Sequence, residues 1–409
     1  MTKKSDAPAI RFKGFSDAWE QRKLTEFVEF FSGLTYTPND VQENGTLVLR
    51  SSNVSNGEVV DADNVYVNPQ VVNSENVKVG DIVVVVRNGS RSLIGKHAQI
   101  KAFMPNTVIG AFMTGIRSEC PEFTNALLNT SRFEEEIAMN MGATINQITG
   151  YMFSKMEFKV PCLDEQKKIG EYFEKLDRLV TLHQRKFEKL TNVKKSMLEK
   201  MFPQNGSSYP EIRFKGFTDP WEQRKFSELV QIERGGSPRP IDYFITDAPN
   251  GLNWVKIGDA PTQGNYITKT AEKIRPEGLS KTREVHPGDL ILSNSMSFGK
   301  PYIMGIDGCI HDGWLLIRNT YGVFDLTFLC HLLGTPQMLS QYRSLAAGST
   351  VNNLNKELVG NTYVTIPSIT EQRVLGAYLE QLDNLITLHQ RELEKLQNIK
   401  KSMLEKMFV

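Results

Sequence analysis

The stretch EQKKIGEYFEKLDRLVTLHQRKFEKLTNVKKSMLEKMF at Glu165–Phe202 returns as EQRVLGAYLEQLDNLITLHQRELEKLQNIKKSMLEKMF at Glu371–Phe408. In both copies the seam residues alternate at spacings of four and three, which is the pattern of a coiled coil. Neither copy contains a proline, so each predicts one unbroken helix of roughly 38 residues, about 57 Å long. The seam of the first copy consists of Ile169, Phe173, Leu176, Val180, His183, Phe187, Leu190, Lys194, Met197 and Met201.

Helices this long and this amphipathic need a partner for their apolar stripe. The simplest partner for one copy is the other, so we expect an antiparallel pair within the chain. His183 and His389 occupy the same seam position, inside the shared TLHQR. We interpret them as polar residues that set the register of the pair, because a metal or catalytic role would need a second ligand nearby and the sequence indicates none.

A shorter segment, which we call the WEQRK segment, is also duplicated. Ile10–Lys23 reads IRFKGFSDAWEQRK, and Ile212–Lys225 reads IRFKGFTDPWEQRK. The interiors that follow do not match, but both approach the long helix through a related phrase, GATINQI at Gly142–Ile148 and GSTVNNL at Gly348–Leu354. One scaffold therefore carries two variable modules that we expect to share a fold and to differ in surface.

The interiors contain signals for both strands and helices. Short β-prone runs, bounded by Gly, Asn, Asp or Pro, occur at Leu47–Leu49, Asp81–Val86, Trp254–Ile257 and Leu290–Leu292. Helical stretches are expected later in each interior, around Ala126–Met139 and Leu326–Leu345. The predicted fold class is therefore α+β, with two mixed α/β domains joined by two long helices that form an antiparallel intramolecular coiled coil.

Length and duplication together define the expected domains. A chain of 409 residues is too long for one typical core, so two globular units are expected. We divide the chain into a first domain, a central helix, a second domain that includes its WEQRK segment, and a C-terminal helix. The respective ranges are 1–163, 164–203, 204–368 and 369–409.

Composition excludes several classes of protein. The contents of hydrophobic (40%) and charged (23%) residues are those of a soluble folded protein. The longest aliphatic run, Ile82–Val86, is too short for a membrane span, and MTKKSDAPAI has no signal-peptide core, so we expect a cytoplasmic protein without a membrane partner. Four cysteines without a CxxC pair fit a reducing compartment. The net charge of +1 decides nothing about nucleic acid.

The duplication also tests candidate reaction centres, because a shared reaction needs its residues in both halves. Asp164–Lys167 could suggest a nuclease cluster, but the second copy has Thr370–Arg373 there, and both fit helix starts. Gly89–Lys96 resembles a phosphate loop but has one residue too many between its glycines. A further group, whose spacing fits no common zinc site, consists of Cys309, His311, Cys330 and His331. We therefore predict no catalytic residue and no metal ligand.

Basic and amide residues in Gly- and Ser-rich loops remain as binding candidates. Arginine reads guanine edges, asparagine reads adenine, and serine or lysine can hold phosphates. The candidates of the first module are Arg50, Ser51, Asn53, Arg87, Asn88, Arg91 and Lys96, with His97 beside them. Those of the second module are Arg234, Ser237, Arg239, Lys256, Asn294, Ser295 and Lys300. Singly they fit solvated surface residues, but as clusters in two modules they indicate DNA binding.

With these features the chain resembles the specificity subunit of a type I restriction–modification system. The resemblance covers essentially the whole length. It rests on the duplicated GFxDxWEQRK, Gly-Asp-(Ile/Leu), G-(A/S)-T-(I/V)-N and P…EQ motifs and on the twin TLHQR helices. It implies two target recognition domains, each reading one half of an asymmetric bipartite site in double-stranded DNA, with the helices setting the spacer between them.

The resemblance also implies partners and cofactors. The helices would dock two methyltransferase subunits, which carry S-adenosylmethionine and the adenine methylation, while restriction subunits would carry ATP and Mg for translocation and cleavage. This chain itself would bind no cofactor and catalyse nothing. Two other classes stay open, namely a non-DNA scaffold with two ligand-binding modules and a freestanding enzyme that reads a split DNA site. Salt dependence of affinity separates DNA binding from the scaffold, since DNA binding weakens steeply as salt rises.

Overall fold

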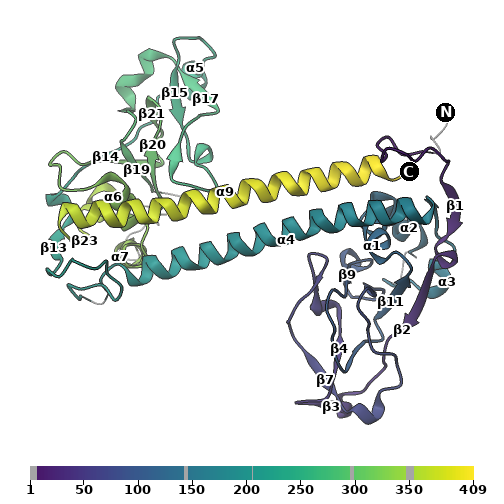
Figure 1. Cartoon of the computed structure of the whole chain (residues 1–409). Coiled ribbons are helices and arrows are strands. Elements are labelled where there is room, and N and C mark those ends of the chain that lie inside the picture. Colours follow the sequence, from purple (N-terminus) through teal and green to yellow (C-terminus); the bar gives the residue numbers. More distant parts are fainter. Residues whose placement is uncertain (1–6, 142–145, 205, 295–298, 347–353) are drawn as a thin grey trace. The chain divides into compact units, whose positions relative to one another are not determined.

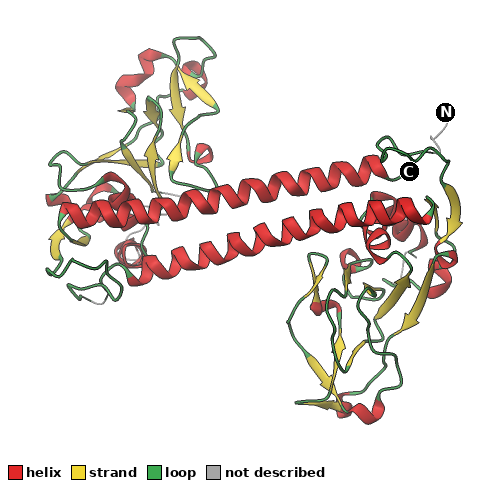
Figure 2. Cartoon of the chain, in the orientation of Figure 1, coloured by secondary structure: helices red, strands yellow, loops and turns green. Residues whose placement is uncertain are grey.

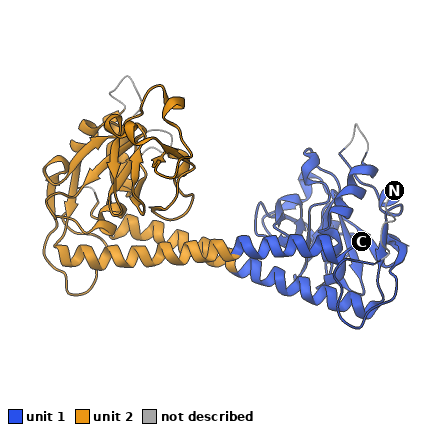
Figure 3. Ribbon diagram, turned by 90° about the horizontal axis from the view of Figure 1, so that it is seen from above, with its two compact units in different colours: residues 1–182, 393–409 blue, residues 183–392 orange. Residues whose placement is uncertain are grey.

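A computed structural model describes residues 7–141, 146–204, 206–294, 299–346 and 354–409. The chain divides into two compact units, Met1–Leu182 with Leu393–Val409 (unit 1) and His183–Glu392 (unit 2) (Figure 3). Each unit combines strands with short helices and with segments of two long helices (Figure 2). Among the described residues, no helix is both long enough and apolar enough to span a membrane.

The two long helices are α4, Leu163–Lys200, and α9, Ile369–Met407 (Figure 1). Each passes through both units. In unit 1, Ile169 and Phe173 of α4 share a core with Leu404 of α9, and in unit 2 Leu375 and Leu379 of α9 pack with Met201 just beyond α4. Since the beginning of each helix meets the end of the other, the predicted antiparallel pairing is confirmed within each unit.

The WEQRK segments are tied to the beginnings of these helices by buried ion pairs. Arg11 donates to both carboxylate oxygens of Glu165 at 2.7 and 2.8 Å, and Arg213 does the same to Glu371 at 2.8 Å for both contacts. Glu165 is 0% exposed and Glu371 is 3% exposed. Hydrogen bonding to the carboxylate raises the pKa of each arginine. The duplicated IRF and EQ motifs are thus the two sides of one structural contact.

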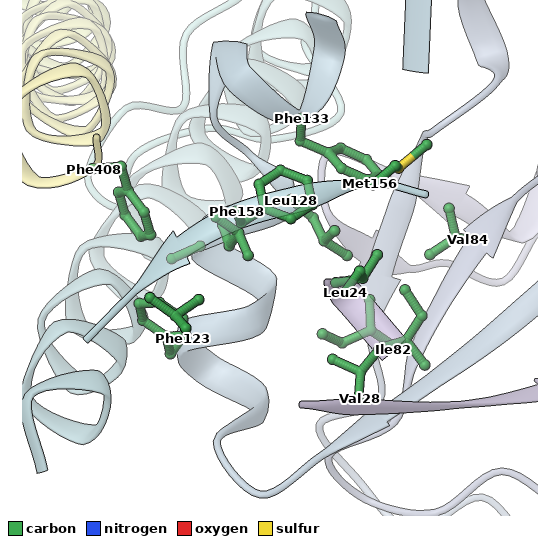
Figure 4. Close-up of a cluster of buried hydrophobic side chains, with 14 of the residues drawn as sticks. Leu24, Val28, Ile82, Val84, Phe123, Leu128, Phe133, Met156, Phe158 and Phe408 are labelled. Atoms are coloured by element: carbon green, nitrogen blue, oxygen red, sulfur yellow. The ribbon is translucent and has the colours of Figure 1, made fainter. Parts of the chain in front are cut away.

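The helix ends are anchored by matching aromatic contacts. Phe408 meets the Trp19 ring edge-on at 6.1 Å and stacks on Phe123 at 5.6 Å, within the unit 1 core of Figure 4. In unit 2, Phe202 meets Trp221 at 6.0 Å and stacks on Phe328 at 5.7 Å. The same sequence, SMLEKMF, precedes both anchors. Each module therefore sits on an equivalent aromatic cluster, which we call the helix-end anchor.

The first module contains two four-stranded sheets. One has the order β2-β11-β8-β9, and the other has the order β10-β4-β7-β3. Their bounds are Val28–Ser32 (β2), Met113–Ser118 (β11), Ile82–Val85 (β8), His97–Gln99 (β9), Thr107–Ile109 (β10), Thr46–Leu49 (β4), Val65–Val67 (β7) and Val41–Gln42 (β3). All four residues of β8 are buried: Ile82 and Val84 belong to the core shared with the long helices, and Val83 and Val85 belong to a second core of the module.

The second module repeats the central strands of this plan but has different edge strands in both sheets. Its sheets have the orders β14-β22-β19-β20-β16 and β17-β15-β21-β18. Their bounds are Gln231–Arg234 (β14), Trp314–Arg318 (β22), Leu290–Ser293 (β19), Pro301–Met304 (β20), Tyr266–Ile267 (β16), Glu272–Ile274 (β17), Leu252–Val255 (β15), Gly308–Ile310 (β21) and Arg283–Val285 (β18). The register of the central strands also matches: Met113 of β11 lies opposite Val85 of β8, and Trp314 of β22 lies opposite Ser293 of β19. The two modules therefore share a fold, as predicted.

The remaining elements close each module against its long helices. Two-stranded sheets pair β1 with β12 and β13 with β23, and a small hairpin is formed by β5 and β6. The strand bounds are Glu20–Lys23 (β1), Glu157–Val160 (β12), Glu222–Lys225 (β13), Tyr363–Ile366 (β23), Val54–Ser55 (β5) and Glu58–Val59 (β6). The short helices are Pro121–Leu128 (α1), Ser131–Asn140 (α2), Gly150–Phe153 (α3), Ile241–Phe244 (α5), Leu326–Leu333 (α6), Pro336–Ala346 (α7) and Lys356–Gly360 (α8).

The helical stretches predicted late in each module are confirmed, and each consists of two helices, α1 and α2 in the first module and α6 and α7 in the second. Thr130 ends α1 and caps α2 by accepting from the Phe133 backbone N–H at 3.3 Å. Thr335 accepts from the Met338 backbone N–H at 3.4 Å and caps α7 in the same way. A cap of this kind satisfies a backbone N–H that the first turn of a helix leaves unpaired. Each threonine therefore marks the beginning of a second helix.

The Gly-Asp motifs before β8 and β19 have a structural explanation. Gly80 has a φ of 96°, which favours glycine, and Asp81 accepts the Lys78 backbone N–H at 2.8 Å. Asp81 also receives two hydrogen bonds from Arg117 of β11, at 2.8 and 2.9 Å, which raises the pKa of that arginine. In the second module Asp289 accepts the His286 backbone N–H at 2.9 Å. The motif thus builds the turn that starts the central strand.

Candidate nucleic-acid interface

Equivalent loops converge at the same end of each module. In unit 1, the segment after β2 packs on the turn between β10 and β11, where a Cβ on Gly33 would lie 2.0 Å from the Gly110 carbonyl oxygen. In unit 2, a Cβ on Gly235 would lie 2.2 Å from the His311 carbonyl oxygen. Only glycine permits backbones to approach this closely, so glycine at these two positions allows the loop segments to pack together.

Arg50 and Lys256 occupy equivalent positions directly after β4 and β15. Each begins a short 3-10 turn, in which the Arg50 backbone N–H donates to Asn53 Oδ1 at 2.9 Å and the Lys256 backbone N–H donates to Asp259 Oδ2 at 2.8 Å. The Arg50 guanidinium donates to the Asp63 carbonyl oxygen at 2.5 Å, and Lys256 Nζ contacts Glu272 Oε1 at 2.5 Å. Both cations are therefore positioned by their own module.

Lys96 and Lys300 also correspond. Each follows a glycine with positive φ, 85° at Gly95 and 75° at Gly299, at the end of the hairpin loop between two strands of the larger core. The Lys96 carbonyl accepts from Val85, and the Lys300 carbonyl accepts from Ser293 at 3.0 Å. The Lys300 ammonium lies 4.9 Å from the centre of the Tyr302 ring. The structure thus aligns two lysines that the sequence predicted independently.

The hairpin loop of the first module carries the other candidates of that half. Asn88 Nδ2 donates to Ser51 Oγ at 3.1 Å, which joins this loop to the turn after β4. The Arg87 guanidinium lies 5.1 Å from the ring centre of Phe112, a side chain that is 56% exposed. Arg91 is exposed and, with Lys96, lines a cleft of about 460 Å³ beside α2.

In the second module the candidates gather around the turn between β21 and β22. Ser237 Oγ donates to Asp312 Oδ1 at 2.8 Å, and Asn294 Nδ2 donates to the Asp312 carbonyl oxygen at 2.8 Å. Arg234, at the end of β14, and Arg239 are both exposed. Ser295 lies outside the described residues. The structure therefore brings Ser237 and Asn294 to one turn, with two exposed arginines on the adjoining segment.

Three candidates are buried. Asn53 is 1% exposed, and its amide donates to the Ala62 carbonyl oxygen at 2.7 Å and to Asn64 Oδ1 at 2.9 Å. Asn294 is 4% exposed, and His97 is 8% exposed with Nδ1 2.9 Å from the Gly95 carbonyl oxygen. Burial lowers the pKa of His97, so the ring is neutral. These side chains have no surface for a base edge, and we assign them a structural role in place of direct contact.

The sequence interpretation missed several residues at these loops. Phe112 and Asp312 were not candidates, because only basic and amide side chains were considered. Asn146 Nδ2 donates to the Gly89 carbonyl oxygen at 3.0 Å, and the Leu354 backbone N–H donates to the Asn294 carbonyl oxygen at 3.1 Å. Asn146 and Leu354 lie in the related motifs GATINQI and GSTVNNL, and this repetition was the sequence signal that could have identified them. Residues 142–145 and 348–353 of these motifs lie outside the described residues.

Of the four residues considered for zinc, Cys309, Cys330 and His331 are buried, whereas the His311 side chain is 37% exposed. Burial raises the pKa of the Cys309 and Cys330 thiols to about 12, and burial together with Lys194 lowers the pKa of His331 to about 4. Among the residues that the structure describes, no three His, Cys, Asp or Glu side chains are grouped as ligands of a metal ion. The four residues considered for zinc therefore do not form such a group.

Two proteins similar to this chain are specificity subunits of type I restriction enzymes. The type I restriction enzyme MjaVIII specificity subunit of Methanocaldococcus jannaschii is 24% identical over 276 residues, which cover 64% of this chain and 64% of that protein. The EcoKI specificity subunit of Escherichia coli K12 is 26% identical over 189 residues, covering 44% of this chain and 40% of that protein. The chain thus spans less than two thirds of these relatives' own length.

A solved structure supports the fold. The crystal structure of the S subunit of a type I restriction–modification system from M. genitalium matches with a TM-score of 0.68 at 14% identity, covering 98% of this chain and 99% of that one. The family model described as type I restriction modification DNA specificity domain matches residues 16–192 and again 218–398. Those two matches cover most of the chain, one for each module, and the chain therefore belongs to the family of type I restriction modification DNA specificity domains.

Proposed function

We propose that this chain is the DNA sequence-specificity subunit of a type I restriction–modification complex, in which each module reads one half of an asymmetric bipartite site in double-stranded DNA. One observation carries the proposal. Two modules that share the same central strands present different side chains on equivalent loops. A shared frame with changed loops is what two readers of different sequences require, because specificity lies in the side chains that reach base edges.

The equivalent loops suggest a division of labour between phosphates and bases. Cations recur at two matched positions, Arg50 with Lys256 and Lys96 with Lys300. A positive charge that both modules keep suits the phosphate backbone, which is the same in every sequence. The adjoining positions differ, as with Phe112 and Gly313. These differing side chains would read the bases, so the two half-sites would differ from each other.

The long helices would set the distance between half-sites. Helices α4 and α9 have 38 and 39 residues, which correspond to about 57 Å at about 1.5 Å per residue. This length exceeds one turn of DNA, which is about 34 Å. A fixed helix length would produce a target with a fixed, unread gap. Linking two readers in this way also raises affinity above that of either reader alone.

The same helices expose apolar residues that would dock methyltransferase subunits. In unit 1, Leu179 and Leu182 of α4 are 43% and 45% exposed. In unit 2, Leu385 and Leu388 of α9 are 43% and 52% exposed. Leucine pairs left open to solvent on a helix favour contact with another helix. Because each pair lies in one copy of the duplicated helix, we propose one docking site for each of two methyltransferase subunits.

Catalysis would belong to the partners. We propose that this chain contributes no catalytic residue, because none of the reaction centres considered in one half recurs in the other. S-adenosylmethionine would then bind to the methyltransferase subunits, and ATP and Mg would bind to the restriction subunits. A non-DNA scaffold remains the second candidate, supported by the exposed leucine pairs alone.

Mapping modified adenines in DNA from cells that co-express this chain with its methyltransferase partner tests the proposal. A split, asymmetric motif with a constant gap is expected. A complex that purifies intact but produces no new methylation, and that binds double-stranded DNA no more tightly at low salt than at high salt, would favour the scaffold instead.

A further inference from the structure

Asp312 is an acidic side chain among the residues proposed to contact DNA in unit 2. It lies in the turn between β21 and β22, and its side chain is 36% exposed. Arg234, on the strand that pairs with β22, and Ser237 lie on the adjoining segment. A carboxylate near DNA repels phosphates and weakens sequence-independent attraction. An acid at this position therefore needs a reason other than general affinity.

The carboxylate is held in one orientation by two donors. Ser237 Oγ donates to Asp312 Oδ1 at 2.8 Å, and His311 Nε2 lies 3.0 Å from the same oxygen. His311 Nδ1 accepts the Gly313 backbone N–H at 3.0 Å, so the proton of the neutral ring sits on Nε2 and is donated to Asp312. Both side-chain contacts thus go to Oδ1, and Oδ2 retains its capacity to accept a hydrogen bond.

The backbone under this group is fixed by close packing. Gly235 packs against the His311 carbonyl, and a Cβ on Gly313 would lie 3.0 Å from Ile257 and 3.2 Å from His311 Nδ1. The rings of Trp254 and His311 are packed in a T-shaped arrangement, with ring centres 5.6 Å apart. A group held this firmly loses little freedom on binding, which is what base reading requires.

We propose that Asp312 Oδ2 accepts a hydrogen bond from the N4 amino group of a cytosine in the half-site read by the second module, an inference that rests on the proposed function. A carboxylate only accepts hydrogen bonds. In the major groove, amino donors are presented by cytosine and by adenine. Adenine also presents the acceptor N7 beside its amino group, which repels a carboxylate, so cytosine is the better partner.

The first module lacks this group. Gly110, Ala111 and Phe112 form the equivalent turn, because Met113 N–H donates to the Gly110 carbonyl at 2.8 Å as Trp314 N–H donates to the His311 carbonyl at 3.1 Å. Ala111 therefore stands where the second module has Asp312. The cytosine contact should be confined to one half of the target.

The test uses the complete complex and compares the wild type with D312A, D312N and a control, D307N. Asp307 is 77% exposed and pairs with His286 at 2.8 Å, so D307N removes the same charge from the same module away from the turn. D312A should lower methylation at the cytosine-containing site by about tenfold relative to sites with another base there. D312N should shift the preference toward adenine, which asparagine reads. Both should bind non-specific DNA more tightly, and D307N should leave the motif unchanged.

The converse variant, A111D, should introduce a cytosine preference into the first half-site, and it tests the idea even where D312A fails to fold. An unchanged second half-site in a folded D312A complex, or a wild-type motif without cytosine there, would overturn the inference. These outcomes leave a split wild-type motif intact. Loss of the split motif itself would instead overturn the proposed function.

Discussion

The Nδ1 atoms of His183 and His389 lie 3.1 Å apart where α4 and α9 meet in unit 2. One ring must donate and the other accept, so at least one of the two is neutral. Burial, together with the nearby His183 and Lys186, lowers the pKa of His389. The histidines predicted to set the register of the helices therefore form a direct contact that depends on protonation.

Replacing both histidines with leucine should remove an acid-sensitive part of the stability. The pKa of His389 is lower in the folded than in the unfolded protein, so folding stability falls as pH drops below the unfolded value of about 6.5. The variant His183→Leu/His389→Leu should lose less stability than the wild type between pH 7.5 and 5.5, as measured by urea unfolding at each pH. Equal losses would mean that the pair does not titrate on unfolding.

His331 predicts a second acid-sensitive step. Its folded pKa of about 4 is well below the unfolded value, so the protein should lose about 3 kcal/mol from this residue as pH falls from about 6.5 to 4. Lys194, Asp383 and Asp325 are the charged groups that influence it. His331→Leu should flatten the pH dependence over this window in the same unfolding assay. The exposed His286→Leu is the control: the hydrogen bond to Asp307 raises the pKa of His286, so its own contribution changes mainly above pH 6.5 and the loss toward pH 4 should remain.

Breaking the Arg213–Glu371 pair should destabilise the protein strongly. Glu371→Gln leaves the arginine without its buried counter-charge, which typically costs about 3–5 kcal/mol of unfolding free energy. The matched control is Arg224→Ala, since the exposed Arg224–Glu228 pair should contribute at most about 1 kcal/mol. Denaturant unfolding measures both. A loss for Glu371→Gln no larger than for the control would contradict the structural role assigned to the duplicated motifs.

Inserting one heptad after Leu182 and another after Glu392 should lengthen the unread gap of the target. Each insertion adds about 10.5 Å of helix, which corresponds to about three base pairs. The doubled insertion keeps the two helices equal, so methylation should move to a motif with the same half-sites and a longer gap. A heptad in only one helix is the control and should abolish methylation. Survival of the original motif in either variant would refute the ruler.

Charging an exposed leucine should weaken methyltransferase docking. Leu182→Glu and Leu388→Glu place a carboxylate on the proposed docking sites, and each should reduce the amount of co-purified methyltransferase by about half. Val79→Glu changes a residue that is 60% exposed on the first module and should have no effect. Full co-purification with the doubly charged variant would place the docking surface elsewhere.

Periodicity made the helices predictable, since a seam spaced by four and three specifies both length and pairing. The duplicated segments made it predictable that the two modules share a fold. Helical stretches were expected around Ala126–Met139, but the sequence did not show where a break divides them; the structure places it at Thr130, which caps α2. Local sequence could not show which side of a turn faces solvent. For this reason Asn53 was counted as a binding residue although its amide is used inside the module.

Asp312 was not predicted as a binding residue for a different reason. Its significance depends on donors from Ser237 and His311, which are brought together by the packing of Gly235. No pattern in the local sequence predicts such a contact. Residues that meet only through tertiary structure are the ones that sequence reasoning misses. The repetition of the segments that contain Arg11 and Glu165 was visible, but the contact between these two residues was not predicted.

The helix-end anchors have an evolutionary consequence. Phe202 and Phe408 follow the same residues and make the same contacts with a tryptophan and a phenylalanine of the module above them. A module that packs on one helix-end anchor should therefore also pack on the other. Under the proposed function, new target sequences would then arise by exchange of whole modules between the two positions, without compensating substitutions in the core.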